Sequence, residues 1–251
     1  MNLETVLEVT HFTDSLFWFK TTKQGWQDKN FQPGEFTMIG MGDEKLTRAY
    51  SIANSPADDY LEFLSIKVQD GPLTSRLQHV KPDDKIEVVA KPIGTLLLRN
   101  LEPEPCINGN GRLWLISTGT GLAPFLSIAR DPEAYEYYEE IIVTHTCRTN
   151  DELVFREEME KFGCKVYQSV TREGPKPGVE RGRITDRIGD GSLFDTLGIE
   201  QDWFDIERDR IMICGNMDFN NEIREMLEAK GWEHGTMRSP GHFVQEKAYV
   251  G

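Results

Sequence analysis

The sequence contains few cysteines for its length, and they lie far apart. The four cysteines among 251 residues are Cys106, Cys147, Cys164 and Cys214, and no two of them form a CxxC pair. This spacing argues against a zinc site, a disulfide scaffold or an iron–sulfur cluster held by the chain itself. We therefore expect no metal centre, and the cysteine usage fits a reducing compartment.

A surplus of basic residues and a long apolar segment are also missing. The chain has 28 Lys and Arg against 42 Asp and Glu, a formal charge of −14. Because nucleic acid and anionic membranes attract positive charge, neither is expected as the main partner. The first residues, MNLETVLEVT, lack the basic and apolar regions of a signal peptide, and no stretch is apolar enough to span a bilayer. Together these absences predict a soluble cytoplasmic protein.

Residues 1–105 have the pattern of an antiparallel β-barrel domain. Short β-rich runs such as TVLEV, LFWFK, EFTMIGM, YLEFLSIKV and KIEVVA alternate with the turn sequences FQPGE, NSPADD and KPDD. Strands this short and this frequent are typical of a small barrel. One helix-like segment, GPLTSRLQHV, interrupts them, and we expect Thr74 or Ser75 to cap its start.

Residues 106–251 alternate strands with helices instead. The Pro- and Gly-containing stretch NLEPEPCINGNG places a domain boundary near residue 105. After it, RLWLIST, EIIVTHTC, CKVYQSV and DRIMICG read as strands, and GLAPFLSIARD, DELVFREEMEKFG and FNNEIREMLEAKG read as helices. In the second helix, Leu153, Val154, Phe155, Met159 and Phe162 come close to helical spacing. The alternation predicts a doubly wound parallel sheet.

A glycine-containing turn, STGTGLAP, follows the first strand of this second half. Its pattern is G-x-G-x-x-P, formed by Gly119, Gly121 and Pro124. A strand, a glycine turn and a helix start in this order can bind phosphate, because the free amides of the helix point at the anion. Loop glycines also often serve geometry alone, so a tight structural turn stays open as the alternative.

Three arginines follow strands of the same half. Arg148 comes after EIIVTHTC, and Arg172 and Arg183 come after CKVYQSV. A strand end that binds NAD usually offers a carboxylate to the ribose, whereas a 2′-phosphate prefers a guanidinium. Each arginine taken alone fits an ordinary surface residue, but the three together beside a phosphate turn favour NADPH over NADH.

A set of motifs resembles the ferredoxin/flavodoxin–NADP⁺ reductases, above all the bacterial type. The motifs are RAYS at 48–51, DGPLTSRL, TGTGLAP, HTCR, CGN and FVQEKAYVG, in the family's order over nearly the whole chain. The resemblance implies a barrel domain carrying FAD and a second domain binding NADP(H). It further implies hydride transfer between NADPH and FAD and single-electron transfer between FAD and ferredoxin or flavodoxin. We expect a monomer.

The resemblance also implies which residues bind FAD. Arg48 and the helix start at Leu73, Thr74 and Ser75 would hold the pyrophosphate, which needs a cation and amide donors. Tyr50 and Ser51 would lie against the isoalloxazine. The other implied FAD contacts are Ala49, Leu64, Ser65, Ile66, Lys67, Val68, Thr120, Ala248 and Tyr249.

The NADP(H) contacts and the reacting centre follow from the same match. The implied NADP(H) contacts are Thr118, Cys147, Arg148, Thr171, Arg172, Arg183 and Asn216. Ser51, Cys214 and Glu246 match a catalytic cluster that orients hydride transfer. We expect them to position the reactants, with acid–base catalysis by Glu246 and a purely structural Cys214 as alternatives.

The chain end departs from the plant-type pattern. Ala248 stands where plant-type enzymes carry a tyrosine that stacks on the flavin, so we expect it at the reacting centre as a small cover that admits the nicotinamide. An acidic redox partner would need a local basic patch in this acidic chain, for which Lys45, Arg48, Lys67 and Arg76 are candidates. Two other functions stay open: an NADH-dependent reductase component, and a flavin-binding redox sensor with little turnover.

Overall fold

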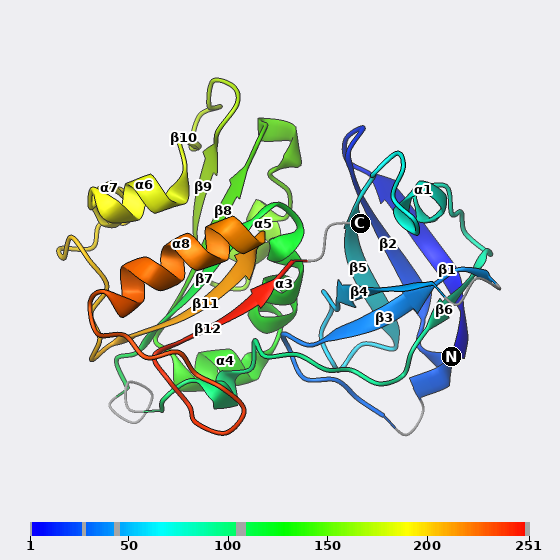
Figure 1. Ribbon diagram of the computed structural model, residues 1–251, viewed down its shortest axis with the longest axis horizontal. Helices are drawn as coiled ribbons and strands as arrows, with labels where there is room; N and C mark the ends of the chain where they lie inside the picture. The colour runs from blue at the N-terminus through cyan, green and yellow to red at the C-terminus, as the bar shows by residue number, and fades with distance from the viewer. Residues whose placement is uncertain (1, 27–28, 43–45, 104–108, 249–251) are drawn as a thin grey trace.

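Within the described residues, two six-stranded sheets form the fold, one from each half of the chain (Figure 1). The computed structural model describes residues 2–26, 29–42, 46–103 and 109–248. The expected domain boundary after residue 105 falls in the gap between the last two ranges, so it stays a prediction. Among the described residues, no helix combines the length and the apolar character needed to cross a bilayer.

The first sheet is antiparallel and closes into a barrel. Its strands are β1 (Asn2–His11), β2 (Leu16–Thr22), β3 (Phe36–Gly40), β4 (Thr47–Ser51), β5 (Tyr60–Ile66) and β6 (Lys85–Val88). They pair in the order β4-β3-β6-β1-β2-β5. Just beyond the edge strand β4, the backbone N–H of Ala53 donates to the carbonyl of Glu62 on the other edge strand, β5, at 2.8 Å, and this bond links the two edges. Buried side chains such as Phe17, Phe19 and Phe63 fill the interior, which confirms the predicted barrel.

The helix between β5 and β6 is shorter than its sequence suggests, and its start is not capped as expected. α1 spans Thr74–Leu77, and its N-cap residue is Leu73, which is fully buried and offers no side-chain cap. The Thr74 hydroxyl donates instead to the carbonyl of Val68 at 3.3 Å. The prediction of a cap by Thr74 or Ser75 is therefore wrong, because the buried Leu73 fixes where this turn begins.

The second sheet is parallel throughout. Its strands are β7 (Arg112–Thr118), β8 (Glu140–Cys147), β9 (Lys165–Val170), β10 (Glu180–Arg181), β11 (Asp209–Gly215) and β12 (Phe243–Lys247). Their order in the sheet is β10-β9-β8-β7-β11-β12. The chain adds β8, β9 and β10 on one side of β7 and then crosses over to add β11 and β12 on the other side, so the strand order switches at β7. In such sheets, ligands bind outside the carboxyl ends of the strands at this reversal point.

Helices cover both faces of the parallel sheet, as the doubly wound prediction requires (Figure 1). One face packs against α3 (Ala123–Ala129), α4 (Pro132–Tyr137) and α5 (Arg156–Lys161), and the other against α6 (Ile184–Gly189), α7 (Ser192–Leu197) and α8 (Met217–Glu228). Along β7 the side chains alternate: Leu113 and Leu115 face the first set, and Trp114 and Ile116 face the second. Short 3₁₀ turns lie at Gln24–Trp26, Leu98–Asn100, Gly119–Leu122 and Asn150–Glu152.

The helix predicted over DELVFREEMEKFG begins later than its sequence suggests. Only Arg156–Lys161 is α-helical, and Phe155 before it has a left-handed backbone with φ of 64°. The ring of Phe155 lies edge-on to Phe12 of the barrel, with ring centroids 5.6 Å apart. This contact between the two halves overrides the helical spacing of Leu153 and Val154.

The two halves share one hydrophobic cluster. Leu16, Trp18 and Leu64 of the barrel belong to the same buried cluster as Phe125 and Leu126 of α3. A shared apolar core holds two halves in one arrangement, so a site between them has fixed walls.

Candidate functional site

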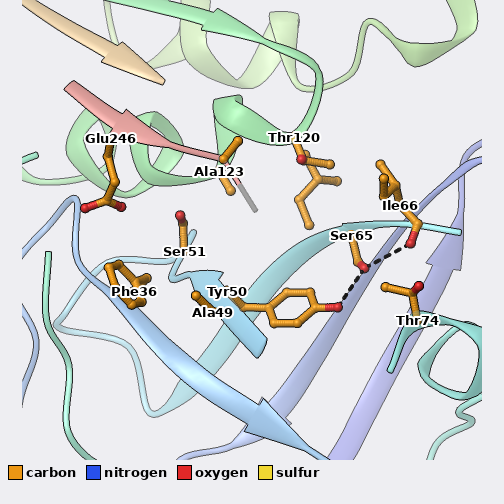
Figure 2. A pocket seen from close by; sticks show the side chains of 12 residues that line it. Phe36, Ala49, Tyr50, Ser51, Ser65, Ile66, Thr74, Thr120, Ala123 and Glu246 are labelled. Carbon is orange, nitrogen blue, oxygen red and sulfur yellow. Dashed lines mark hydrogen bonds between the residues drawn. The ribbon is translucent and has the colours of Figure 1, made fainter. Parts of the chain in front are cut away.

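A narrow pocket lies where the barrel meets the parallel-sheet half (Figure 2). We call it the ring pocket. Its barrel side is made by the ends of β3, β4 and β5, and its other side by the turn after β7 and the end of β12. The lining residues are Phe36, Ala49, Tyr50, Ser51, Leu64, Ser65, Ile66, Thr74, Thr120, Ala123, Glu246 and Ala248.

Tyr50 gives the ring pocket a flat aromatic wall. Its ring is only 8% exposed and lies edge-on to Phe19 and Phe63. The Ser65 hydroxyl donates to the phenolic oxygen of Tyr50 at 3.4 Å, and Figure 2 shows the Tyr50 ring extending towards Ser65. Burial raises the pKa of Tyr50, so the side chain stays a neutral phenol.

Glu246 brings a carboxyl group to the ring pocket. Figure 2 places its carboxyl group on the same side of the pocket as Ser51 and Phe36. Burial raises the pKa of Glu246 to about 7, Glu35 nearby acts in the same direction, and hydrogen bonds from Thr95 oppose both. A carboxyl group with a pKa in this range can hold or release a proton near neutral pH.

Cys214 lies behind the ring pocket and does not line it. It is 1% exposed and stands opposite Glu246 in the pairing of β11 with β12. Burial raises the pKa of the Cys214 thiol well above its usual value, so it stays uncharged. Of the three predicted cluster members, the structure therefore brings Ser51 and Glu246 to the pocket and leaves Cys214 in the core.

A larger groove continues from the ring pocket along the carboxyl ends of the parallel strands. It has a volume of about 690 Å³ and shares Ile66, Thr120 and Ala248 with the ring pocket. We call it the nucleotide groove. All seven residues expected to contact NADP(H) line it: Thr118, Cys147, Arg148, Thr171, Arg172, Arg183 and Asn216.

The glycine turn after β7 has features of both alternatives left open by its sequence, a tight structural turn and a phosphate-binding turn. A Cβ atom on Gly121 would lie 2.1 Å from the carbonyl oxygen of Cys214, so only glycine lets the turn after β7 approach the end of β11 this closely. Gly119 has φ of +54° and lines the nucleotide groove. Gly121 is therefore needed for close packing against β11, whereas Gly119 borders the groove in which a phosphate group would bind.

The arginines of the nucleotide groove are arranged for an anion. Arg148 and Arg172 are exposed, and the described part of the chain contains no ion pair for either guanidinium. Arg183 is paired with Glu222 of α8. Asn216 caps the start of α8, where its side-chain oxygen accepts from the Phe219 N–H at 3.0 Å. Two unpaired cations beside a helix start form an environment that suits a phosphate group.

The residues expected to bind FAD are divided among three places. Those that line the ring pocket are Ala49, Tyr50, Ser51, Leu64, Ser65, Ile66, Thr74, Thr120 and Ala248, while Lys67 and Val68 line the nucleotide groove. Leu73 and Ser75 line neither cavity, and Tyr249 lies outside the described residues. Arg48 also lines neither, and its guanidinium donates to the carbonyl of Thr47 at 2.9 Å.

Several lining residues were not predicted from the sequence. Phe36 stands opposite Ser51 in the pairing of β3 with β4, and Ala123 follows the glycine turn. Phe36 could have been found from the expected pairing of its strand with RAYS, and Ala123 from its place within the TGTGLAP motif. In the nucleotide groove, Ser15 and Glu152 come from opposite halves and bond to each other at 3.2 Å, a contact with no sequence signal. Among the described residues no cluster of His, Cys, Asp or Glu could hold a metal ion.

The chain is similar to known oxidoreductases. Residues 115–225 match the family model of the oxidoreductase NAD-binding domain. The chain is 43% identical over 99% of its length to a flavodoxin/ferredoxin–NADP reductase of Rhodobacter capsulatus, covering 93% of that protein. It is 40% identical over its full length to a ferredoxin–NADP reductase of Azotobacter vinelandii, covering 98% of that protein.

A solved structure resembles the whole fold. It is a ferredoxin NADP⁺ reductase from Neisseria gonorrhoeae with bound FAD and NADP, 25% identical in sequence, with a TM-score of 0.88. The match covers 99% of this chain and 98% of that one. Sequence identity over the full length and a shared two-sheet fold lead to one conclusion: the chain belongs to the ferredoxin/flavodoxin–NADP reductase family.

Proposed function

We propose that this protein passes a hydride between NADPH and a bound FAD, and single electrons between that FAD and ferredoxin or flavodoxin. The observation that carries the proposal is the continuity of the ring pocket with the nucleotide groove through Ile66, Thr120 and Ala248. A pyridine nucleotide in the groove can reach a flat ring in the pocket without leaving the protein surface. The family of the chain supports the same reaction.

The lining of the ring pocket fits the chemistry of a flavin. A flat, partly apolar ring system needs an aromatic or aliphatic face and a few polar groups at its edge. Tyr50 and Ala49 offer such faces, and Ser51 and Thr120 offer hydroxyl groups.

The nucleotide groove fits a nucleotide that carries a 2′-phosphate. Guanidinium groups bind phosphate through paired, charge-assisted hydrogen bonds. Within the described residues, Arg148 and Arg172 form no ion pair that phosphate binding would break. Arg183 is paired with Glu222, so its guanidinium would have to bind the phosphate alongside Glu222 or break that ion pair. Arg148 follows β8 directly, at the position where NAD-binding folds usually carry a carboxylate that binds the ribose.

The protein residues position the reactants and exclude water. When bound, FAD supplies the hydride acceptor and the single-electron donor. Tyr50 would give the flavin ring a flat support, and Ser51 and Glu246 lie together on one side of the pocket. Ala248, from the α/β half, lines both cavities, and its methyl group covers less of the pocket than a larger side chain would. The Glu246 carboxyl group, with a pKa of about 7, can exchange a proton with solvent between turnovers.

The identity of the redox partner rests on the family and on local charge. Ferredoxin or flavodoxin would dock beside the ring pocket, where Lys67 and Arg76 are half-exposed. Of the other two candidates of the basic patch, Arg48 is half-exposed as well, and Lys45 lies outside the described residues. Reversing the charge of Lys67 and Arg76 should slow ferredoxin reduction at low salt and have less effect at high salt, because salt screens such attraction. An unchanged rate at low salt would remove this patch from the proposal.

One anaerobic experiment tests the reaction itself. NADPH is added to the yellow, FAD-loaded protein, and the flavin absorbance band is followed; oxidised ferredoxin or flavodoxin is then added. Bleaching by NADPH and recovery with the partner protein are expected. Absent or very slow bleaching would favour a redox sensor instead, and bleaching without recovery would exclude the added protein as the partner.

A further inference from the structure

We infer that Thr95, in the barrel half, is a positioning residue that holds the carboxyl group of Glu246 across the junction of the two halves. The role is distinct from that of the pocket-lining residues, since Thr95 does not line the ring pocket and is exposed to solvent. Because this role presupposes the proposed function, its test below includes a measurement that does not depend on turnover.

Thr95 contacts both the side chain of Glu246 and the strand that carries it. Its backbone N–H donates to Oε2 of Glu246 at 2.9 Å. Its hydroxyl lies 3.3 Å from the same oxygen and 3.1 Å from the carbonyl oxygen of Gln245, so one hydroxyl hydrogen is shared between the two acceptors. A carboxylate oxygen that accepts two donors from one residue is held in direction as well as in distance.

The backbone around Thr95 is fixed to the barrel. Ile93 exchanges two backbone hydrogen bonds with Phe36, at 2.8 and 3.0 Å. Gly94 lies so close to the barrel that a Cβ atom on it would be 3.1 Å from the Cα of Glu35. On the other side, the amide of the buried Asn100 donates to the Thr95 carbonyl at 2.9 Å. The two donors of Thr95 are thus presented by a rigid part of the barrel.

The backbone of Glu246, in contrast, is fixed to the α/β half. β12 pairs with β11, which places Glu246 opposite Cys214. The side-chain amide of Asn220 on α8 donates to the carbonyl of Glu246 at 2.8 Å. Its own half therefore fixes the main chain of Glu246, whereas the direction of the carboxyl group depends on Thr95.

The charge around the carboxyl group sets the direction of the expected effect. The titratable groups beside it are Glu35 from the barrel, the buried Cys214 on β11 and Lys247 next along β12. Burial and Glu35 favour the protonated acid, and the hydrogen bonds from Thr95 favour the carboxylate. Loss of the Thr95 hydroxyl removes a donor to the carboxylate, so the pKa of Glu246 should rise further.

Three variants test the role on the FAD-loaded protein. Thr95→Val removes the hydroxyl and keeps the shape and the backbone N–H, and Thr95→Ser restores a hydroxyl. Thr196→Val is the matched control, since Thr196 is an exposed threonine on α7 whose hydroxyl donates to the Ser192 carbonyl at 2.8 Å. The Glu246 carboxyl is titrated by ¹³C NMR, with its signal assigned by its loss in Glu246→Gln. The pH profile of flavin reduction by NADPH is measured in parallel.

In Thr95→Val the pKa of Glu246 should rise by about half a unit to one unit, the range expected for one hydrogen bond. The pH profile should shift by the same amount, and Thr95→Ser and Thr196→Val should match the parent. Parent-like titration of Thr95→Val, or an equal shift in Thr95→Ser or Thr196→Val, would overturn the role of the hydroxyl. Failure of the proposed function would look different: NADPH would not bleach the parent protein, while the NMR titration could still be read.

Discussion

The guanidinium of Arg130, at the end of α3, donates to the carboxylate of Glu62 on β5 at 2.8 Å and ties the two halves together. Glu62 is 2% exposed. Arg130 also donates to the carbonyl of Ala53 at 2.8 Å and to Glu158 of α5. This buried contact lies on the side of the junction away from the residues that line the ring pocket, and it supports the arrangement on which the pocket depends.

Replacing Arg130 by methionine should destabilise the protein strongly. Glu62 would stay buried without a partner, which costs about 3–5 kcal/mol in the free energy of unfolding. Urea unfolding measures the loss. The exposed pair of Arg156 and Glu160, 2.8 Å apart within α5, is the control, and Arg156→Met should cost only about 0.5 kcal/mol. Equal losses in the two variants would contradict a special role for the Arg130 contact, and added Glu62→Gln should recover part of the loss.

Glu246 should make the stability of the protein fall as pH rises. Its pKa is about 7 in the folded protein against 4.5 for the unfolded group. Between these values the folded state holds a proton that the unfolded state has lost, so each step up in pH favours unfolding. The stabilisation is fully present below pH 4.5 and is lost as pH rises through about 7.

The measurement is urea unfolding of the parent and of Glu246→Gln across this range. The glutamine cannot ionise, so the parent should lose about 2–3 kcal/mol relative to the variant as pH rises from 4.5 to above 7. If the free energies of unfolding of the parent and of Glu246→Gln changed with pH in parallel, Glu246 would have an ordinary pKa in the folded protein.

Arg48 should be needed to retain FAD. Its guanidinium donates to the carbonyl of Thr47 and forms no ion pair within the described residues, so it can turn towards a pyrophosphate at low cost. Loss of one charge-assisted contact corresponds to about a 10- to 100-fold rise in the dissociation constant of FAD. Fluorescence of released flavin measures this for Arg48→Ala, with Arg99→Ala as a control at an exposed arginine outside both cavities. Parent-like retention in Arg48→Ala would remove it from the FAD site.

The nucleotide groove could be predicted from sequence because its residues follow strand ends. In a parallel sheet all carboxyl ends meet at one edge, so Arg148 after β8 and Arg172 after β9 had to lie near the turn at Gly119. The barrel wall of the ring pocket was located differently: the resemblance of the RAYS motif to the family implied Tyr50 and Ser51, and both line the pocket.

Contacts between distant segments could not be predicted. Thr95 reaches Glu246 from 151 positions away through a loop without regular structure, and no periodicity marks it. Phe155 leaves the helix because its ring meets Phe12 of the barrel, whereas its spacing alone fits a helix. Leu73 starts α1 because it is buried, although Thr74 and Ser75 have the higher preference for capping. In each case packing outweighed local preference.

The central claim is that the arginines of the nucleotide groove select NADPH as the hydride donor. Stopped-flow reduction of the bound flavin by NADPH and by NADH, in the parent and in the double variant Arg148→Ala/Arg172→Ala, tests it most directly. NADPH should reduce the parent much faster at limiting concentration, and the double variant should lose this preference while its rate with NADH is unchanged. A parent that prefers NADH, or a double variant that keeps the preference for NADPH, would contradict it.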